Sequence, residues 1–313
     1  MKKVTLSDQL TIHTFNRTEA RVLFHEIFTT GAYLKHGIGL KQNDLVFDIG
    51  ANIGMFTLFI NKYFPGTKII AFEPVLPIFT VLQRNVSDCI HNDQVRTFNI
   101  GISNKNQSVV FQFNKHLSMT AGMYTNELEK SVQKKATLIQ WIHALLVDHA
   151  VSNPNSRPFT SWLIKGMKQP ILKNIIAYSL FIPVLLYLLV MKSTTKKIRC
   201  QLQTLSDFIS LNNISEIALC KIDVEGSESD VLSGIADEHW NHFKQFIIEV
   251  HDLNSRVDAI KELLTSKGFS VIIDQEDWEL HKLMNIYTVF AFRNKVLSLD
   301  RSEFQNVYEQ DHT

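Results

Sequence analysis

Blocks of apolar residues separated by mixed polar stretches predict alternating strands and helices in the first part of the chain. The strands are expected at residues 45–47, 68–72, 95–100 and 109–113, and the helices at residues 55–63 and 77–87. Before this stretch the pattern predicts only a lead-in of helix and turn over residues 1–43. Strands that alternate with helices are typical of a parallel sheet with helices packed on both faces.

A second alternating stretch begins near residue 198 and predicts the remainder of the same sheet. A strand end that runs into a helix is expected at residues 201–210, further strands at residues 218–224, 245–250, 269–273 and 286–292, and a helix at residues 257–266. We expect the last two strands to form an antiparallel pair that closes the sheet. Ser227, with Asp230 three residues later, predicts a capping box at a helix start, and Gly234 predicts the end of that helix.

About seventy residues separate the two stretches, so we divide the chain into residues 1–126, an insertion at 127–197, and residues 198–313. Apolar residues at helical spacing predict an amphipathic helix in the insertion, and Ile175–Met191 is an uncharged run with Pro183 near its centre. Because both flanking parts belong to one sheet, both ends of this run must emerge on the same side of any membrane. We interpret it as a hydrophobic lid, a segment that dips into lipid, a dimer contact or an ordinary core helix.

Composition narrows the class of protein. The 313 residues are enough for a sizeable core, and a net charge of +1 gives no field that favours nucleic acid, so no such partner is expected. Three scattered cysteines indicate a reducing compartment without a disulfide framework, which predicts the cytoplasm, and the first ten residues lack the apolar run of a secretory signal. Basic residues on both sides of Ile175–Met191 suit anionic lipid, so membrane contact through this run is expected at the inner face.

The residues most informative about chemistry are the sequence Asp-Ile-Gly-Ala-Asn-Ile-Gly at 48–54 and the acid Glu73 one strand later. Gly50 and Gly54 let the backbone approach a ligand closely, and an acid at the next strand end can bind both hydroxyls of a ribose. The turn lacks the G-x-G-x-x-G spacing that suits a pyrophosphate, and Asp48 would repel that anion. A carboxylate there favours the sulfonium and ammonium groups of S-adenosylmethionine (SAM) instead.

These residues and two later motifs resemble the FkbM-type family of SAM-dependent methyltransferases. The family's D-x-G-A-N-x-G appears at 48–54, its K-I-D-V-E-G-x-E at 221–228 and its Glu-x-His at 249–251. The segment Leu205–Phe208 resembles the family's L-D-x-F with a serine in the acidic place. The insertion departs from a minimal family member, so the substrate is not carried over from the resemblance.

The resemblance implies an α/β fold with a doubly wound, mostly parallel, seven-stranded sheet, interrupted by the helical hydrophobic insertion. It also implies that the strand ending at Asp48 lies beside the strand ending at Asp223, with the strand of Glu249 next. Ligands bind at the carboxyl ends of such strands. The expected cofactor-binding residues are Asp48, Gly50, Asn52, Gly54, Glu73, Asn99 and Ser103. Of these, Asn99 and Ser103 are expected from the fold to flank the adenine, although the segment 99–103 also fits a plain loop.

Four residues are expected to carry the chemistry, namely Asp223, Glu225, Glu249 and His251. Asp223 and Glu225 are two positions apart, as are Glu249 and His251. If the strands stay extended, the two side chains of each pair point to the same side of the sheet. An alcohol acceptor must lose its proton during methyl transfer, and Asp223 or His251 is the expected base, with Glu225 and Glu249 orienting it or the substrate. Two alternatives stay open: the acids hold a divalent cation that binds a diol, or Asp223 and Glu225 only cap a helix.

We therefore predict a SAM-dependent methyltransferase that methylates a hydroxyl of a large or lipid-like acceptor, such as a polyketide, glycolipid or terpenoid. The alternatives are a methyltransferase-like module that binds without turnover and a nicotinamide oxidoreductase, against which the missing G-x-G-x-x-G speaks. His239 and His242 have the spacing of metal ligands on one helical face, but a solvated helix end explains them as well, and no metal site is assigned.

Overall fold

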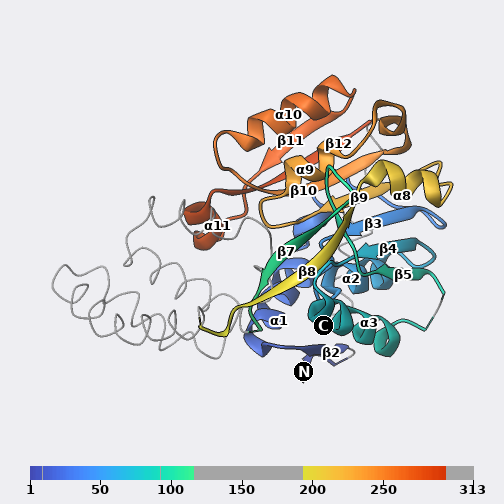
Figure 1. Cartoon of the computed structure of the whole chain (residues 1–313). Helices are drawn as coiled ribbons and strands as arrows, with labels where there is room; N and C mark the ends of the chain where they lie inside the picture. The colour runs from blue at the N-terminus through green and yellow to red at the C-terminus, as the bar shows by residue number, and fades with distance from the viewer. Residues whose placement is uncertain (9, 92, 116–192, 294–313) are drawn as a thin grey trace.

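We describe residues 1–8, 10–91, 93–115 and 193–293 of a computed structural model of the chain (Figure 1). Most of the predicted insertion, including the apolar run Ile175–Met191, and the polar tail from residue 294 lie outside these residues. Within the described part, no helix is both long enough and apolar enough to cross a membrane.

One seven-stranded sheet forms the centre of the molecule, in the order β11-β12-β10-β9-β3-β4-β5. Its strands are β3 (Leu45–Ile49), β4 (Lys68–Phe72), β5 (Val95–Phe98), β9 (Leu219–Ile222), β10 (Gln245–His251), β11 (Ser270–Asp274) and β12 (Ile286–Phe292). Only β12 pairs antiparallel with its neighbours in this sheet, and the other pairs are parallel. The predicted α/β class with a mostly parallel seven-stranded sheet, the closing pair and the central strand order are confirmed, whereas the helical insertion stays a prediction.

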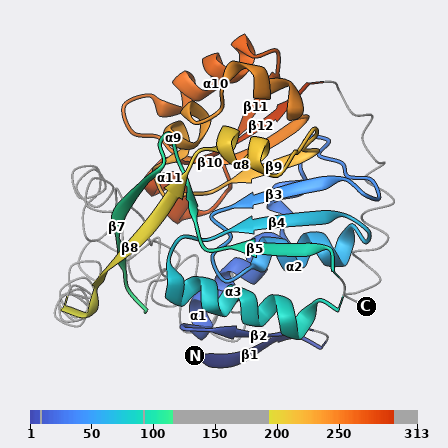
Figure 2. The ribbon, with the colours of Figure 1, turned by 45° about the vertical axis from the view of Figure 1, so that its right-hand side comes forward.

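Helices cover both faces of the sheet (Figure 2). The α-helices of the described residues are α1 (Arg17–Phe24), α2 (Met55–Tyr63), α3 (Leu76–Cys89), α8 (Leu205–Leu211), α9 (Glu228–Ser233), α10 (Arg256–Ser266) and α11 (Glu279–Met284). Successive residues of a strand point to opposite faces, so Val46 joins the core under α2 whereas Phe47 joins the core beside α8. This alternation within strands buried on both sides explains why their sequences read as continuous apolar runs.

The strand predicted at 109–113 forms, but it lies outside the main sheet. It is β7 (Gln107–Phe113), which pairs antiparallel with β8 (Lys196–Gln203) in a small sheet that also holds β6 (Gly101–Ile102). Figure 1 shows β7 and β8 as a two-stranded arm beside the main sheet. The chain therefore leaves and re-enters the described part through adjacent strands, which joins the two predicted halves.

The lead-in over residues 1–43 was predicted as helix and turn, and this is incomplete. It begins with an antiparallel hairpin of β1 (Lys2–Ser7) and β2 (Leu10–Thr14), followed by α1, a π-helix η1 (His25–Thr29) and a short 3-10 helix η2 (Ala32–Leu34). The hairpin packs on α3, where Asn85 donates to the backbone oxygen of His13 at 3.1 Å. Strands this short gain their stability from such packing, which their own sequence does not reveal.

The predicted capping box at α9 is wrong in its contacts. Ser227 occupies the N-cap position, but its side chain makes no capping hydrogen bond, and Asp230 accepts instead from the side chain of Asn104 at 3.0 Å. Gly234 does end the helix, as predicted.

Candidate active site

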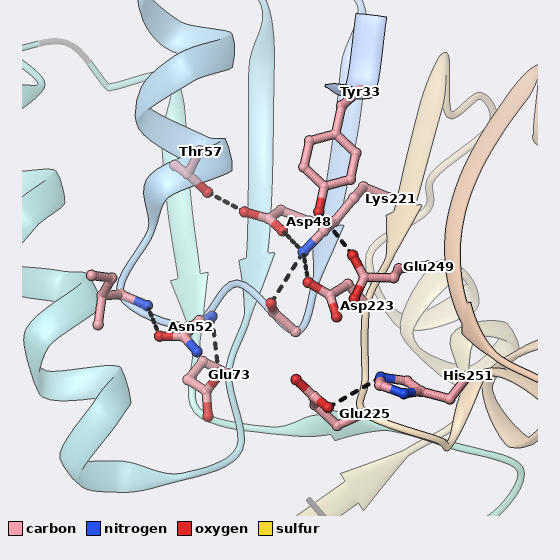
Figure 3. A network of polar contacts seen from close by, with 12 residues as sticks. Tyr33, Asp48, Asn52, Thr57, Glu73, Lys221, Asp223, Glu225, Glu249 and His251 are labelled. Carbon is pink, nitrogen blue, oxygen red and sulfur yellow. Dashed lines mark hydrogen bonds and ion pairs between the residues drawn. The ribbon is translucent and has the colours of Figure 1, made fainter. Parts of the chain in front are cut away.

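The carboxyl ends of three neighbouring strands, β3, β9 and β10, bring the predicted acidic residues together (Figure 3). In the ladders, Asp48 lies opposite Lys221, and Ile248 lies opposite Ile222. Parallel strands in this register end at the same edge of the sheet, where the turns that follow them converge. The sequence therefore placed these acids on the correct strands and at the correct edge.

Lys221 lies at the centre of this edge, and the sequence analysis gave it no role. Its Nζ is 3.1 Å from Asp223 Oδ2 and 3.5 Å from Asp48 Oδ1, and it donates to the backbone oxygen of Gly50 at 3.3 Å. The residue is only 4% exposed, and although burial alone would lower its pKa, the charges of Asp223 and Asp48 raise it. Lys221 is thus a buried cation shared by two strand ends, and its identity in the motif reflects that pairing.

Asp48 is fully buried beneath the site. Its Oδ2 accepts a hydrogen bond of 2.6 Å from Thr57 Oγ1 on α2. Burial raises the pKa of Asp48, and the nearby charge of Lys221 opposes that shift. The sequence predicted that the negative charge of Asp48 faces a cationic ligand. Lys221 already matches part of that charge, and direct contact between Asp48 and a ligand stays a prediction.

The glycine turn is shaped by its neighbours in the fold. Gly50 has φ +78°, and a Cβ on it would lie 1.8 Å from the backbone oxygen of Asp223. Gly54 has φ +91° and would place a Cβ 2.7 Å from a side-chain carbon of Leu82. Only glycine combines this backbone conformation with so close a neighbour. The turn thereby brings the end of β3 directly against the end of β9.

Glu73 follows β4 and is held by the turn it faces. Its two oxygens accept backbone N–H groups of Asn52 and Val75 at 3.1 and 2.8 Å, and Asn52 itself is left-handed, with φ +50°. Burial raises the pKa of Glu73 to about 7, against the lowering effect of the two amides. A carboxylate has about four lone-pair sites, so Glu73 retains capacity for ligand hydroxyls after these two bonds.

Asn99 and Ser103, predicted to flank the adenine, have structural contacts. The side-chain amide of Asn99 donates to the backbone oxygens of Glu73 and Pro74 at 2.9 and 3.0 Å. Ser103 is 1% exposed, and its backbone N–H donates to Gln203 at 2.9 Å. Asn99 therefore fixes the turn that carries Glu73, whereas Ser103 is closed off beside β8. Their roles toward a cofactor stay predictions.

Asp223 and Glu225 do not point to the same side, because the strand ends at Ile222. Glu225 is left-handed, with φ +51°, which turns its carboxylate toward β10 while Asp223 faces Lys221. Glu225 Oε2 lies 3.2 Å from His251 Nε2. The loop thus separates the pair, and the contact between Glu225 and His251 is one the sequence did not predict.

His251 combines burial with an incomplete set of partners. It is 3% exposed, and within the described residues neither ring nitrogen makes a hydrogen bond of good geometry, although Nε2 lies 3.2 Å from Glu225 Oε2 as an ion pair and Nδ1 has no partner of either kind. Burial lowers its pKa, but Glu225 and the carboxylates of Glu228 and Asp223 raise it more, so the net shift is upward from 6.5. Glu225 can only accept, so it favours the tautomer with the proton on Nε2 and leaves a lone pair on Nδ1.

Two further groups reach this edge from the lead-in, and sequence reasoning missed both. Tyr33 on η2 donates its hydroxyl to Glu249 Oε2 at 3.4 Å. Glu26 on η1 is buried, and burial, together with the charges of Asp223 and Glu276, raises its pKa to about 8. Burial likewise raises the pKa of Glu249, with Asp223 and Glu26 adding to it. No local pattern marks Glu26, because packing of the π-helix alone brings it here.

The residues considered for a metal do not form a metal centre. His239 and His242 lie on a 3-10 helix, where His239 contacts Ser210 at 3.4 Å and His242 Nδ1 contacts the backbone oxygen of Ile214 at 2.9 Å. Across the residues that the structure describes, no group of three or more His, Cys, Asp or Glu has an arrangement that could hold a metal ion. All three cysteines are free thiols.

Comparison with known proteins gives matches over most of the chain. The sequence model of the family described as the methyltransferase FkbM domain matches residues 48–271. The chain is 31% identical over 276 residues to 31-O-demethyl-FK506 methyltransferase FkbM of Streptomyces tacrolimicus, covering 88% of this chain and 92% of that protein. It is 27% identical over 298 residues to methyltransferase 1 of Beauveria bassiana, covering 94% and 99%. A crystal structure of methyltransferase FkbM from Methylobacillus flagellatus aligns with TM-score 0.43 and 12% identity, covering 92% and 57%.

Proposed function

The chain belongs to the FkbM methyltransferase family and is a methyltransferase; from this premise we propose that it moves a methyl group from SAM to a hydroxyl oxygen. The observation that carries the proposal is the imidazole of His251, buried at the strand ends with Glu225 on one nitrogen and no described partner on the other. A hydroxyl acceptor needs such a proton acceptor, because it must lose its proton as the new bond forms.

The residues at the edge of the sheet fit SAM as the methyl donor. The carboxyl groups of Asp48, Asp223 and Glu249 lie around the one amino group of Lys221, so this excess of acidic groups favours a ligand with positive charge. Glu73 would bind the ribose hydroxyls through its remaining lone pairs. SAM would supply an electrophilic methyl carbon, and the chain's own residues would orient the acceptor and take its proton.

The structure favours His251 over Asp223 as the base, a choice that the sequence left open. The carboxylate of Asp223 lies 3.1 Å from Nζ of Lys221 and is engaged as the partner of that cation. His251 has a raised pKa, so it binds a proton readily near neutral pH, while Glu225 stabilises the imidazolium that forms. Asp223 and Lys221 would then hold the turn, and Glu249 with Tyr33 would line the acceptor side.

Two observations support an oxygen acceptor of large, apolar character. The relative from Streptomyces tacrolimicus is named for a 31-O-demethyl substrate, and so for methylation of an oxygen. The run Ile175–Met191 is uncharged and apolar in sequence, which suits a polyketide, glycolipid or terpenoid acceptor, or contact with a membrane that holds the acceptor. Deletion of residues 168–197 should change acceptor preference or partitioning into anionic vesicles, and unchanged behaviour in both assays would rule out this part of the proposal.

The proposal is tested by incubating the purified chain with SAM carrying a labelled methyl group and with apolar extracts of its own cells. We expect label in an apolar product whose mass rises by one CH2, and no label with the His251→Gln variant. Saturable SAM binding with no labelled product in any extract would point to a binding module. Saturable binding of NADH in place of SAM would instead point to the oxidoreductase.

A further inference from the structure

Two charged residues outside the reacting set connect the loop that carries Glu225 to the strand that carries His251. Glu228, the first residue of α9, is fully buried, and its Oε1 accepts the backbone N–H of Gly226 at 2.6 Å. Its other oxygen, Oε2, accepts from Arg256 Nη1 at 3.1 Å. The same Nη1 donates to the backbone oxygen of His251 at 3.2 Å.

These contacts link the loop of Glu225 to the strand of His251, the two residues that take part in the proposed reaction. Glu225 and Gly226 are consecutive left-handed residues, with φ +51° and +95°, so the loop departs sharply from the line of β9. The bond to Glu228 holds this turn, and the bonds of Arg256 hold the end of β10. A capping role for Glu228 would account for its contact near the start of α9 but not for the bridge through Arg256 to His251.

We propose that Glu228 and Arg256 are positioning residues that hold the carboxylate of Glu225 against His251 and set the charge around the imidazole. The proposal rests on the proposed use of His251 as the proton acceptor and names the residues that make it one. Neither residue touches the reacting atoms, so both act through the pair that they align.

Among the described residues, the charged and titratable groups that act on His251 are Asp223 and Glu225 in the loop after β9, Glu228 on α9 and His281 on α11. Arg256 on α10 contacts the backbone oxygen of His251 and the carboxylate of Glu228. Burial and the charge of His251 lower the pKa of His281 to about 4, so His281 is neutral near pH 7. Glu228 is therefore the second carboxylate, after Glu225, that stabilises the imidazolium of His251.

The test measures the pKa of His251 in the full chain by NMR titration of histidine ring protons. The His251 signal is assigned from its loss in the His251→Gln variant. Glu228→Gln keeps the shape and an acceptor oxygen but removes the negative charge, so we expect the pKa of His251 to fall by about one unit. Arg256→Met removes a neighbouring positive charge and should move the same pKa upward. The opposite signs distinguish charge positioning from a general loss of structure.

Arg293→Met is the matched control. Arg293 also donates to backbone oxygens, those of Phe243 and Trp240 at 3.1 and 2.9 Å, but at the opposite edge of the sheet. The Arg293→Met variant should leave the pKa of His251 unchanged. An unchanged pKa in Glu228→Gln, or an equal shift in Arg293→Met, overturns the proposal. If Glu228→Gln does not fold, Arg256→Met carries the test, and if neither folds, the pair is a structural bridge only and the proposal is wrong.

A turnover measurement separates this inference from the proposed function. With a working acceptor, Glu228→Gln should lower kcat about tenfold, leave SAM affinity within about twofold, and shift the acid limb of the pH–rate profile toward lower pH. A shift in the pKa of His251 without methyl transfer by the wild-type chain would retain the positioning and reject the reaction.

Discussion

The turns after β3 and β4 and the loops after β9 and β10 meet at one edge of the sheet, yet they differ in how their polar groups are satisfied. On the first side, Glu73 accepts two backbone N–H groups and Asp48 accepts from Thr57. On the second side, Glu225 is left-handed and one nitrogen of His251 has no partner among the described residues. On the first side both carboxyl groups are anchored by hydrogen bonds from the protein, whereas on the second side the buried imidazole of His251 has only the ion pair with Glu225.

Acidic residues with similar motif positions therefore serve different purposes. Groups that are already paired are held rigidly and suit the binding of a cofactor in a fixed place. A buried imidazole with a free lone pair is costly to the fold and suits proton transfer, because it needs no rearrangement to accept a proton. The variants below test this division between a holding side and a reacting side.

The largest effect is expected from His251→Gln. Removing the proton acceptor should reduce methyl transfer by about 10²–10⁴-fold, while SAM affinity stays within a few-fold, because the reacting side does not hold the cofactor. Single-turnover transfer of a labelled methyl group measures the first quantity and calorimetry with SAM measures the second. Equal losses of both would abolish the distinction between the two sides.

Lys221→Met should produce the next largest effect, this time on stability. It leaves the buried carboxylate of Asp48 without its cation, which should lower the free energy of unfolding by about 3–5 kcal/mol. Lys244→Met, which breaks an exposed pair with Glu216, is the control and should cost less than about 1 kcal/mol. Urea unfolding measures both, and similar values for the two variants would show that Lys221 is not shared as the structure indicates.

Stability should also depend on pH through the buried acids. The pKa is raised from 4.5 to about 7 in Glu73 and about 8 in Glu26, so the folded state binds their protons more tightly than the unfolded state. Their contribution is fully present below pH 4.5 and is lost as pH rises through 7 to 8. Glu26→Gln should make this fall clearly shallower, whereas the exposed Glu262→Gln should leave it unchanged. Unfolding at several pH values measures the slope, and identical slopes in all three proteins would contradict the assignment.

The smallest effect is expected for the two aspartates in cofactor binding. Asp48→Asn removes a charge from the holding side and should weaken SAM binding about tenfold. Asp223→Asn should change SAM affinity less than about threefold, although it lowers turnover, because its partner Lys221 keeps the turn in place. Calorimetry measures the SAM affinity of both variants. A larger loss of affinity in Asp223→Asn than in Asp48→Asn would show that the two roles are exchanged.

Sequence reasoning succeeded where the signal is local. Met55–Tyr63 and Lys68–Phe72 were predicted with the bounds that the structure shows, because apolar spacing and the flanking glycines define each element within a few residues. The order of β3, β9 and β10 came from the family resemblance and is confirmed. The hairpin of β1 and β2 was missed, since its short strands depend on packing against α3.

The candidate site was predicted in part for the same reason. Asp48, Asp223 and Glu249 could be placed at strand ends from the sequence, but the contact of Glu225 with His251 depends on a left-handed backbone that no motif letter specifies. Glu26 and Tyr33 could not be found, because only the packing of the lead-in against the sheet brings them to its edge.

The kind of fold, the family and the strand that each acid ends could be predicted from the amino-acid sequence, because apolar periodicity and short motifs are properties of neighbouring residues. Which of those acids has a cation beside it, and which side chain faces His251, depends on the folded arrangement. Pairing and burial depend on side chains that are distant along the chain, such as Lys221 beside Asp48 and Arg256 beside Glu228. Their energies follow from the local environment, which forms only when the strands meet.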